Sequence, residues 1–125
     1  MTSRTVIATT SAAAPSAGYS QGVRFGDLVF TAGQTGTALD GRLATTLAEQ
    51  VDLAIDNLAR VLEAGGSSLD QVVKTTCFLA DVADFAEFDT AYRRRFSAPL
   101  PARSTVGVAF AGQGLLFEIE AIAGL

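Results

Sequence analysis

Arg103 and Glu118 are the residues of this chain whose types and placement are best suited to chemistry. Each stands in a short apolar run, Arg103 in residues 101–108 and Glu118 in residues 116–122. An ionised side chain in such a run is costly to bury unless it is paired or has a task. A guanidinium can hold a carboxylate through two hydrogen bonds, and a carboxyl group between apolar neighbours can have a raised pKa that suits acid/base catalysis. The pair therefore predicts a site that binds a carboxylate and moves a proton.

An ordinary ion pair across neighbouring strands is the competing interpretation, because such pairs are common and often only structural. The chain has no histidine and a single cysteine, Cys77, so it lacks the usual parts of a catalytic triad, a cysteine protease or a zinc site. Attack by water on an already electrophilic centre is the reaction that remains. We expect Cys77, within an apolar strand, to be a small buried hydrophobe rather than a reactive thiol.

Two C-terminal strands must position the pair. Side chains alternate along a strand, and we expect Ser104 and Val106 to face the core, so that Arg103 and Glu118 share the sheet face turned away from the helices. If the two strands pair as a hairpin about residues 111–114, Glu118 lies opposite Gly107. Arg103 then lies roughly 13 Å further along the sheet, a gap that its long side chain and a small substrate could bridge. This register holds only if the strands are neighbours.

The remaining elements follow from hydrophobic spacing and turn residues. Strands are expected at residues 5–7, 23–25 and 28–32, the last two joined by the Gly26-Asp27 turn, and a central strand at 72–79. Thr46 and Glu49 have the spacing of a capping box, which begins a helix that ends at Gly65-Gly66. A second helix begins at Asp81 or Asp84 and carries an aromatic stripe that we expect to face the core: Phe85, Phe88, Tyr92 and Phe96. The order β-β-β-α-β-α-β-β predicts an α+β fold with both helices on one face of one sheet.

Length and composition predict a single domain over residues 1–125. Because 22 of the hydrophobic residues are alanine, the core is lean, and we expect part of the apolar surface to be buried between subunits. The net charge of −4 disfavours nucleic acid or an anionic membrane as a partner. No apolar run approaches the roughly 20 residues of a membrane span, and no signal-type hydrophobic segment opens the chain, so we expect a cytoplasmic protein.

Three consecutive arginines, Arg93, Arg94 and Arg95, are the feature that could favour RNA binding. On a helix, three adjacent side chains spread over about 200° and cannot form one tight patch. Because the total charge is also acidic, we interpret them as a solvated helix face.

Short motifs run in one order through nearly the whole chain, and together they are highly specific although each alone is weak. They are Gly18-Tyr19-Ser20-Gln21, Gly26-Asp27-Leu28-Val29-Phe30, Gly33-Gln34, Ala48-Glu49-Gln50, Asn57-Leu58, Val61-Leu62-Glu63-Ala64-Gly65, Ser67-Ser68-Leu69-Asp70, Val73-Lys74-Thr75-Thr76, Phe78-Leu79, Asp84-Phe85, Pro101-Ala102-Arg103-Ser104 and Glu118-Ile119-Glu120-Ala121-Ile122-Ala123. With these motifs the chain resembles the YjgF/RidA family of reactive intermediate (enamine/imine) deaminases.

The resemblance implies a chorismate-mutase-like fold and a homotrimer, a trimeric barrel whose sheets face inward and whose active sites lie in clefts between subunits. It implies hydrolysis of 2-imino acids such as 2-iminopropanoate or 2-iminobutanoate to the 2-oxo acid and ammonia, without metal or organic cofactor. By the family's pattern, Arg103 holds the substrate carboxylate while Glu118 orients water and shuttles its proton. Tyr19 helps to close the pocket, and the backbone around Gly33 and Thr105 lines it.

Three positions depart from the family's pattern at this implied site. Thr105 stands where a cysteine is typical, Ala32 where a serine or threonine precedes Gly-Gln, and Asp89 where an asparagine is frequent. Thr105 can replace the cysteine if that position serves through its main-chain carbonyl. Ala32 and Asp89 change hydrogen bonding and charge at the pocket edge, and so bear on substrate choice. Two other functions stay open: a trimer that binds a small carboxylate without catalysis, and the endoribonuclease or translation-inhibitor activity for which some relatives of the family are named.

Overall fold

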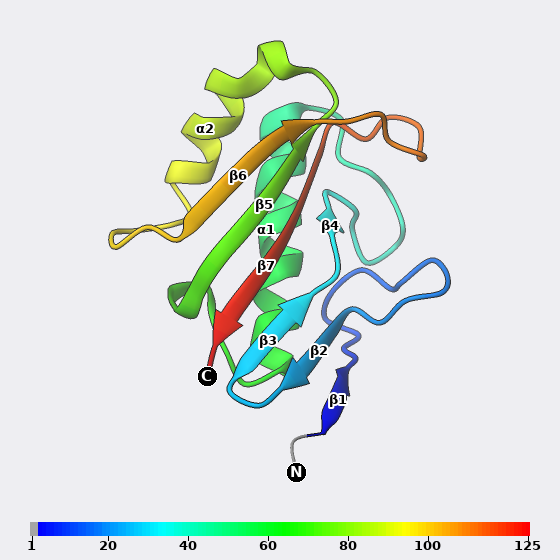
Figure 1. The fold of residues 1–125 in the computed structure, drawn as a ribbon. Coiled ribbons are helices and arrows are strands. Elements are labelled where there is room, and N and C mark those ends of the chain that lie inside the picture. Colours follow the sequence, from blue (N-terminus) through cyan, green and yellow to red (C-terminus); the bar gives the residue numbers. More distant parts are fainter. Residues whose placement is uncertain (1–2) are drawn as a thin grey trace.

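In the computed structural model, which describes residues 3–125, two α-helices lie on one face of a mixed β-sheet (Figure 1). The helices are α1 (Leu47–Ala64) and α2 (Phe85–Arg93), and single 3₁₀ turns, η1 (Leu69–Gln71) and η2 (Val82–Asp84), precede β5 and α2. The strands are β1 (Arg4–Ile7), β2 (Gly22–Phe25), β3 (Leu28–Thr31), β4 (Gln34–Thr35), β5 (Val72–Leu79), β6 (Ala102–Gly107) and β7 (Phe117–Gly124). The predicted α+β class is confirmed. The two-residue strand β4 was not predicted, because it is too short to show a pattern.

The order of the strands differs from the predicted C-terminal hairpin. The sheet runs β1-β2-β3-β7-β5-β6, and β4 also pairs with β7. Strand β5 therefore separates β6 from β7, parallel to the first and antiparallel to the second. Every second side chain of β7, from Phe117 to Ala123, is buried, which suits a strand inside the sheet rather than at its edge. The expected hairpin register is wrong, and β6 is left as an edge strand.

Helix α1 forms as its capping residues predict. The Thr46 hydroxyl accepts a hydrogen bond from the Glu49 backbone N–H at 3.2 Å and donates one to the Glu49 carboxylate at 2.8 Å. Gly65 caps the other end, and Gly66 continues the chain with a φ of 89°, which favours glycine. Apolar residues recur along the helix at helical spacing, and Val51 and Ile55 among them are completely buried.

The sheet face away from the helices exposes several large apolar side chains in the single chain. Val6, Leu28, Phe30 and Val106 lie on it with between 39% and 60% of their surface exposed. The expectation that Ser104 and Val106 face the core is wrong, since they pair with Thr76 and Phe78 on the face opposite to the buried residue Cys77. Within residues 3–125 no helix lies on this face (Figure 1). Burial between subunits stays a prediction for it.

The aromatic stripe of α2 is buried with one exception. Phe88, Tyr92 and Phe96 each expose 5% or less, but Phe85 exposes 44% because it lies at the first turn of the helix, beside the sheet edge.

Cys77 is fully buried, and burial raises the pKa of its thiol to about 12. The interpretation of Cys77 as a small hydrophobe is therefore confirmed.

The three arginines at the end of α2 do not form one basic patch. Arg95 bonds through Nη2 to the Asp56 carboxylate of α1 at 2.6 Å, and its Nη1 lies 3.6 Å from the Asp52 carboxylate. Arg93 lies 4.0 Å from Asp89, and Arg94 forms no ion pair within the described chain. Arg95 therefore joins the two helices. No helix within residues 3–125 has both the length and the apolar character needed to cross a membrane.

Candidate active site

Arg103 lies on the edge strand β6 and extends toward helix α2. Its Nη1 donates a hydrogen bond to Asp89 Oδ1 at 2.8 Å, and this is the guanidinium's one hydrogen bond to a described residue. The guanidinium carbon lies 4.7 Å from the ring centre of Tyr92 and 5.1 Å from that of Phe88, within range of cation–π attraction. The Arg103 side chain is 22% exposed and packs over these aromatic rings. Its Nε and Nη2 form no hydrogen bond with a described residue.

Thr105 lies on the same face of β6, two residues from Arg103. Its hydroxyl oxygen is buried and has no hydrogen-bond partner among residues 3–125. A cavity of about 360 Å³ opens beside Arg103, lined also by Asp89, Tyr92, Arg93, Leu100 and Pro101. We call Asp89, Arg103 and Thr105 the arginine cluster.

Glu118 lies on β7 in contact with Gly33. A methyl group added to Gly33 would lie 2.7 Å from both Cδ and Oε2 of Glu118, so any larger residue there would displace this carboxyl group from its position. Across the strand pair, Glu118 faces Thr35 of β4. Burial raises the pKa of the half-buried Glu118 carboxyl above its ordinary value, and the nearby Glu120 adds to the rise. Such a group can take up and return a proton near neutral pH.

Tyr19 and Ala32 lie near Gly33. The Ala32 N–H donates to the Gln21 carbonyl at 2.8 Å, and the Tyr19 hydroxyl accepts a hydrogen bond from the Ser16 N–H at 3.2 Å. Tyr19 and Gly33 line a common cavity of about 150 Å³. We call Tyr19, Ala32, Gly33 and Glu118 the glutamate cluster.

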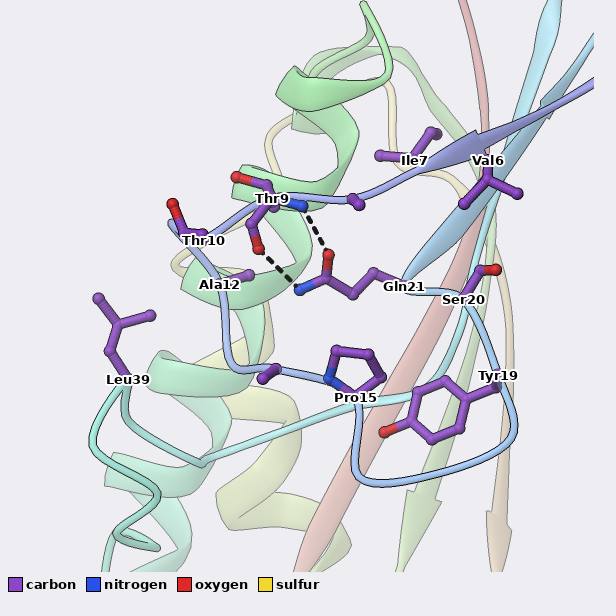
Figure 2. A pocket seen from close by; sticks show the side chains of 12 residues that line it. Val6, Ile7, Thr9, Thr10, Ala12, Pro15, Tyr19, Ser20, Gln21 and Leu39 are labelled. Atoms are coloured by element: carbon purple, nitrogen blue, oxygen red, sulfur yellow. Dashed lines mark hydrogen bonds between the residues drawn. The ribbon is translucent and has the colours of Figure 1, made fainter.

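Gln21 holds the loop that carries Tyr19, a role that the sequence did not predict. Its side-chain amide donates to the carbonyls of Thr9 and Ala13 and accepts from the Thr9 N–H, so all three bonds tie the N-terminal loop down. Figure 2 shows the pair of bonds to Thr9, with the Tyr19 ring on the adjacent segment. The Gly18-Tyr19-Ser20-Gln21 motif was the only signal at this position.

Tyr19 also borders a larger cavity of about 570 Å³ (Figure 2). Its lining comes mainly from residues 6–21, with Leu39 on the opposite wall, and contains no charged side chain. This cavity therefore has no group that could bind a carboxylate by charge. The guanidinium of Arg103 and the carboxyl group of Glu118 lie in the two clusters instead.

Within one chain the two clusters do not meet. Thr75 pairs with Arg103 and is buried under α2, whereas Phe78 pairs with Glu118 three residues further along β5. Because these two partners on β5 are three positions apart, which is an odd number, Arg103 and Glu118 lie on opposite faces of the sheet. Two strand spacings and three residues separate their α-carbons by about 14 Å. The expectation of a shared face is wrong, because alternation along each strand could not show how β6 and β7 are related across β5.

The fold and the clusters define a small α+β protein of the chorismate-mutase-like class, with a guanidinium and a half-buried carboxyl group in separate places. Residues 3–125 contain no group of three or more acidic, histidine or cysteine side chains placed to hold a metal ion.

A family model described as Endoribonuclease L-PSP matches residues 9–125, and the chain belongs to this family, the YjgF/RidA family. Protein HMF1 of Saccharomyces cerevisiae is 41% identical over 98% of this chain and 96% of its own length. The 2-iminobutanoate/2-iminopropanoate deaminase of Mus musculus is 39% identical over 96% of this chain and 90% of its own. The solved structure of E. coli TdcF with bound serine matches with a TM-score of 0.91 at 34% identity, covering 97% of this chain and 98% of TdcF. Some other relatives are named as mitochondrial or chloroplastic.

Proposed function

We propose that this protein is a deaminase that hydrolyses 2-imino acids, such as 2-iminopropanoate and 2-iminobutanoate, to 2-oxo acids and ammonia. The observation that carries the proposal is the similarity over 96% of the chain to a mouse protein named for this activity. The structure adds two suitable groups: a guanidinium with free nitrogens at Arg103, and a carboxyl group of raised pKa at Glu118.

The reaction needs little more than these two groups. Arg103 holds the substrate carboxylate with the nitrogens that Asp89 leaves free. Glu118 accepts a proton from water while the water oxygen bonds to the imine carbon, and then returns that proton to the departing nitrogen. The hydroxyl group of the resulting carbinolamine then gives its proton, through Glu118, to the same nitrogen as the carbon–nitrogen bond breaks. Ammonia leaves, and the oxygen from water becomes the carbonyl oxygen of the 2-oxo acid. Tyr19 closes the pocket over the substrate.

The proposal includes a site shared between two subunits of a homotrimer. Arg103 and Glu118 lie on opposite sheet faces of one chain, so a small substrate can touch both only if they come from different copies. Three features support this assembly: the open edge of β6, the exposed large apolar side chains on the sheet face away from the helices, and the unpartnered Thr105 hydroxyl. The serine bound to E. coli TdcF shows that a relative takes a ligand of this size with a carboxylate.

The activity is tested by following the decay of freshly generated 2-iminopropanoate with and without the protein. We expect the decay to accelerate in proportion to protein concentration. The uncatalysed reaction is already fast, so a barrier lower by about 4 kcal/mol, a factor of about a thousand in rate, is sufficient. An equal concentration of an unrelated protein serves as the control, and no acceleration above that control would contradict the proposal.

RNA cleavage is a second candidate, because the matching family model is described as an endoribonuclease. Arg95 is engaged with two aspartates of α1, and the net charge is −4, so these features do not favour an RNA site. Incubation with single-stranded RNA should leave the RNA intact.

The cytoplasmic location also stays a proposal, based on the sequence.

A further inference from the structure

The guanidinium proposed to bind the substrate carboxylate already has a carboxylate partner in its own chain. Asp89 Oδ1 lies 2.8 Å from Arg103 Nη1, and the two side chains are 25% and 22% exposed, so the pair faces the adjoining cavity of about 360 Å³. Arg93 is 4.0 Å from the other Asp89 oxygen, but its side chain is 70% exposed and contributes little. The ligand-facing charge of this pair is therefore close to zero.

An anionic ligand at Arg103 would meet the negative charge of Asp89. Nη2 and Nε of the guanidinium are free to bind a second carboxylate, but its centre would then lie about 6 Å from the Asp89 carboxylate. At an effective dielectric constant between 20 and 80, repulsion over that distance weakens binding by roughly threefold to a hundredfold. A positive nitrogen on the adjacent carbon of the ligand would instead be attracted to Asp89.

We propose that Asp89 makes this site select ligands that carry both a carboxylate and a cationic nitrogen on the neighbouring carbon, over ligands that carry the carboxylate alone. The substrate class is then the protonated, iminium form of a 2-imino acid, which is a zwitterion. The 2-oxo acid product has lost the nitrogen and is a plain anion, so the same aspartate favours its release. The assignment of iminium as substrate rests on the proposed function, but the charge selection does not.

Two ligands with the same carbon skeleton test this selection by calorimetry on the full-length protein. L-2-Aminobutanoate is a zwitterion, and 2-oxobutanoate is an anion. The wild-type protein should bind L-2-aminobutanoate more tightly. Asp89→Asn, which keeps a hydrogen-bond acceptor for Arg103 and removes the charge, should strengthen 2-oxobutanoate binding about tenfold and weaken L-2-aminobutanoate binding about tenfold.

The matched control is Glu87→Gln, which removes the same charge from the same helix at an exposed residue that forms no ion pair within residues 3–125. It should change the ratio of the two affinities by less than about twofold, as expected for a screened surface charge. If Asp89→Asn does not fold, as judged by circular dichroism, Asp89→Ser replaces it. The inference is overturned if the Asp89 variant changes both affinities by one factor, changes neither, or if neither ligand binds.

Because the readout is binding, its outcome is separate from that of the imine assay. A protein that hydrolyses imines but shows no change in the affinity ratio keeps the proposed function and loses this inference. A protein whose affinity ratio shifts as expected but that leaves imines intact loses the proposed function and keeps the selection by Asp89.

Discussion

Arg103→Ala is expected to lower kcat/KM for 2-iminopropanoate by about a thousandfold, close to the loss of all catalysis. The variant removes a charge-assisted, two-bond contact to the substrate carboxylate, and it also leaves the Asp89 carboxylate unpaired beside the ligand. The measurement is the initial rate of imine decay against substrate concentration. The rate should fall because substrate is no longer held near the proton-accepting group.

Two further variants separate the guanidinium from positive charge in general. Arg103→Lys keeps a positive charge but not the planar fork, so it should recover only part of the lost activity. Arg94→Ala removes a nearby arginine that makes no ion pair in the described chain, and it should leave the rate unchanged. If Arg103→Ala retains more than half of the wild-type kcat/KM, Arg103 is not the anchor, and the Arg103–Asp89 pair is only structural.

Glu118→Gln is expected to lower kcat by about a hundredfold to a thousandfold with a smaller change in KM, because the amide cannot accept the proton of the attacking water. The pH dependence gives a sharper test. Burial and Glu120 raise the pKa of Glu118, so the wild-type kcat should fall on acidification with a midpoint above the ordinary carboxyl value. The residual rate of the glutamine variant should lack this acidic limb, and a limb that persists unchanged in that variant would contradict the assignment.

Glu118→Gln should lower activity but raise the stability of the folded protein near neutral pH. A folded-state pKa above the unfolded one means that Glu118 contributes stability at low pH, and that this contribution is lost as pH rises through the folded pKa. Glu118→Gln removes that loss, so near neutral pH it should unfold at a higher denaturant concentration than the wild-type protein. Glu120→Gln, on the same strand and face, is the matched control: it should keep activity and move the acidic limb to lower pH.

The sequence predicted the elements that local signals specify. The capping box at Thr46 and Glu49, the glycine stop of α1 and the turn at Gly26 all appear as expected, since each depends on contacts within a few residues. The arrangement of β6 and β7 could not be predicted in this way. It depends on β5 lying between them, a pairing between distant segments that no turn residue between β6 and β7 indicates.

At the candidate site, too, the sequence indicates which residues are suited to chemistry, but their relative positions depend on contacts between distant segments. Residue type and neighbours indicated Arg103 and Glu118, but their faces followed only from the strand order. The close approach of Gly33 to Glu118 depends on β4 pairing with β7, and a two-residue strand leaves no pattern in the sequence. Asp89 was noticed as a departure from the family, but its bond to Arg103 joins a helix to a strand and could not be seen before the fold was known.

We expect each active site to take Arg103 from one subunit and Glu118 from another. Arg103→Ala and Glu118→Gln chains, carrying different tags, would be co-expressed, and trimers that hold both tags would be purified. In a cyclic trimer of two kinds of chain, one of the three clefts has both residues intact, so the mixed trimers should show about one third of the wild-type kcat per trimer. Mixed trimers no more active than either parent would contradict the shared site.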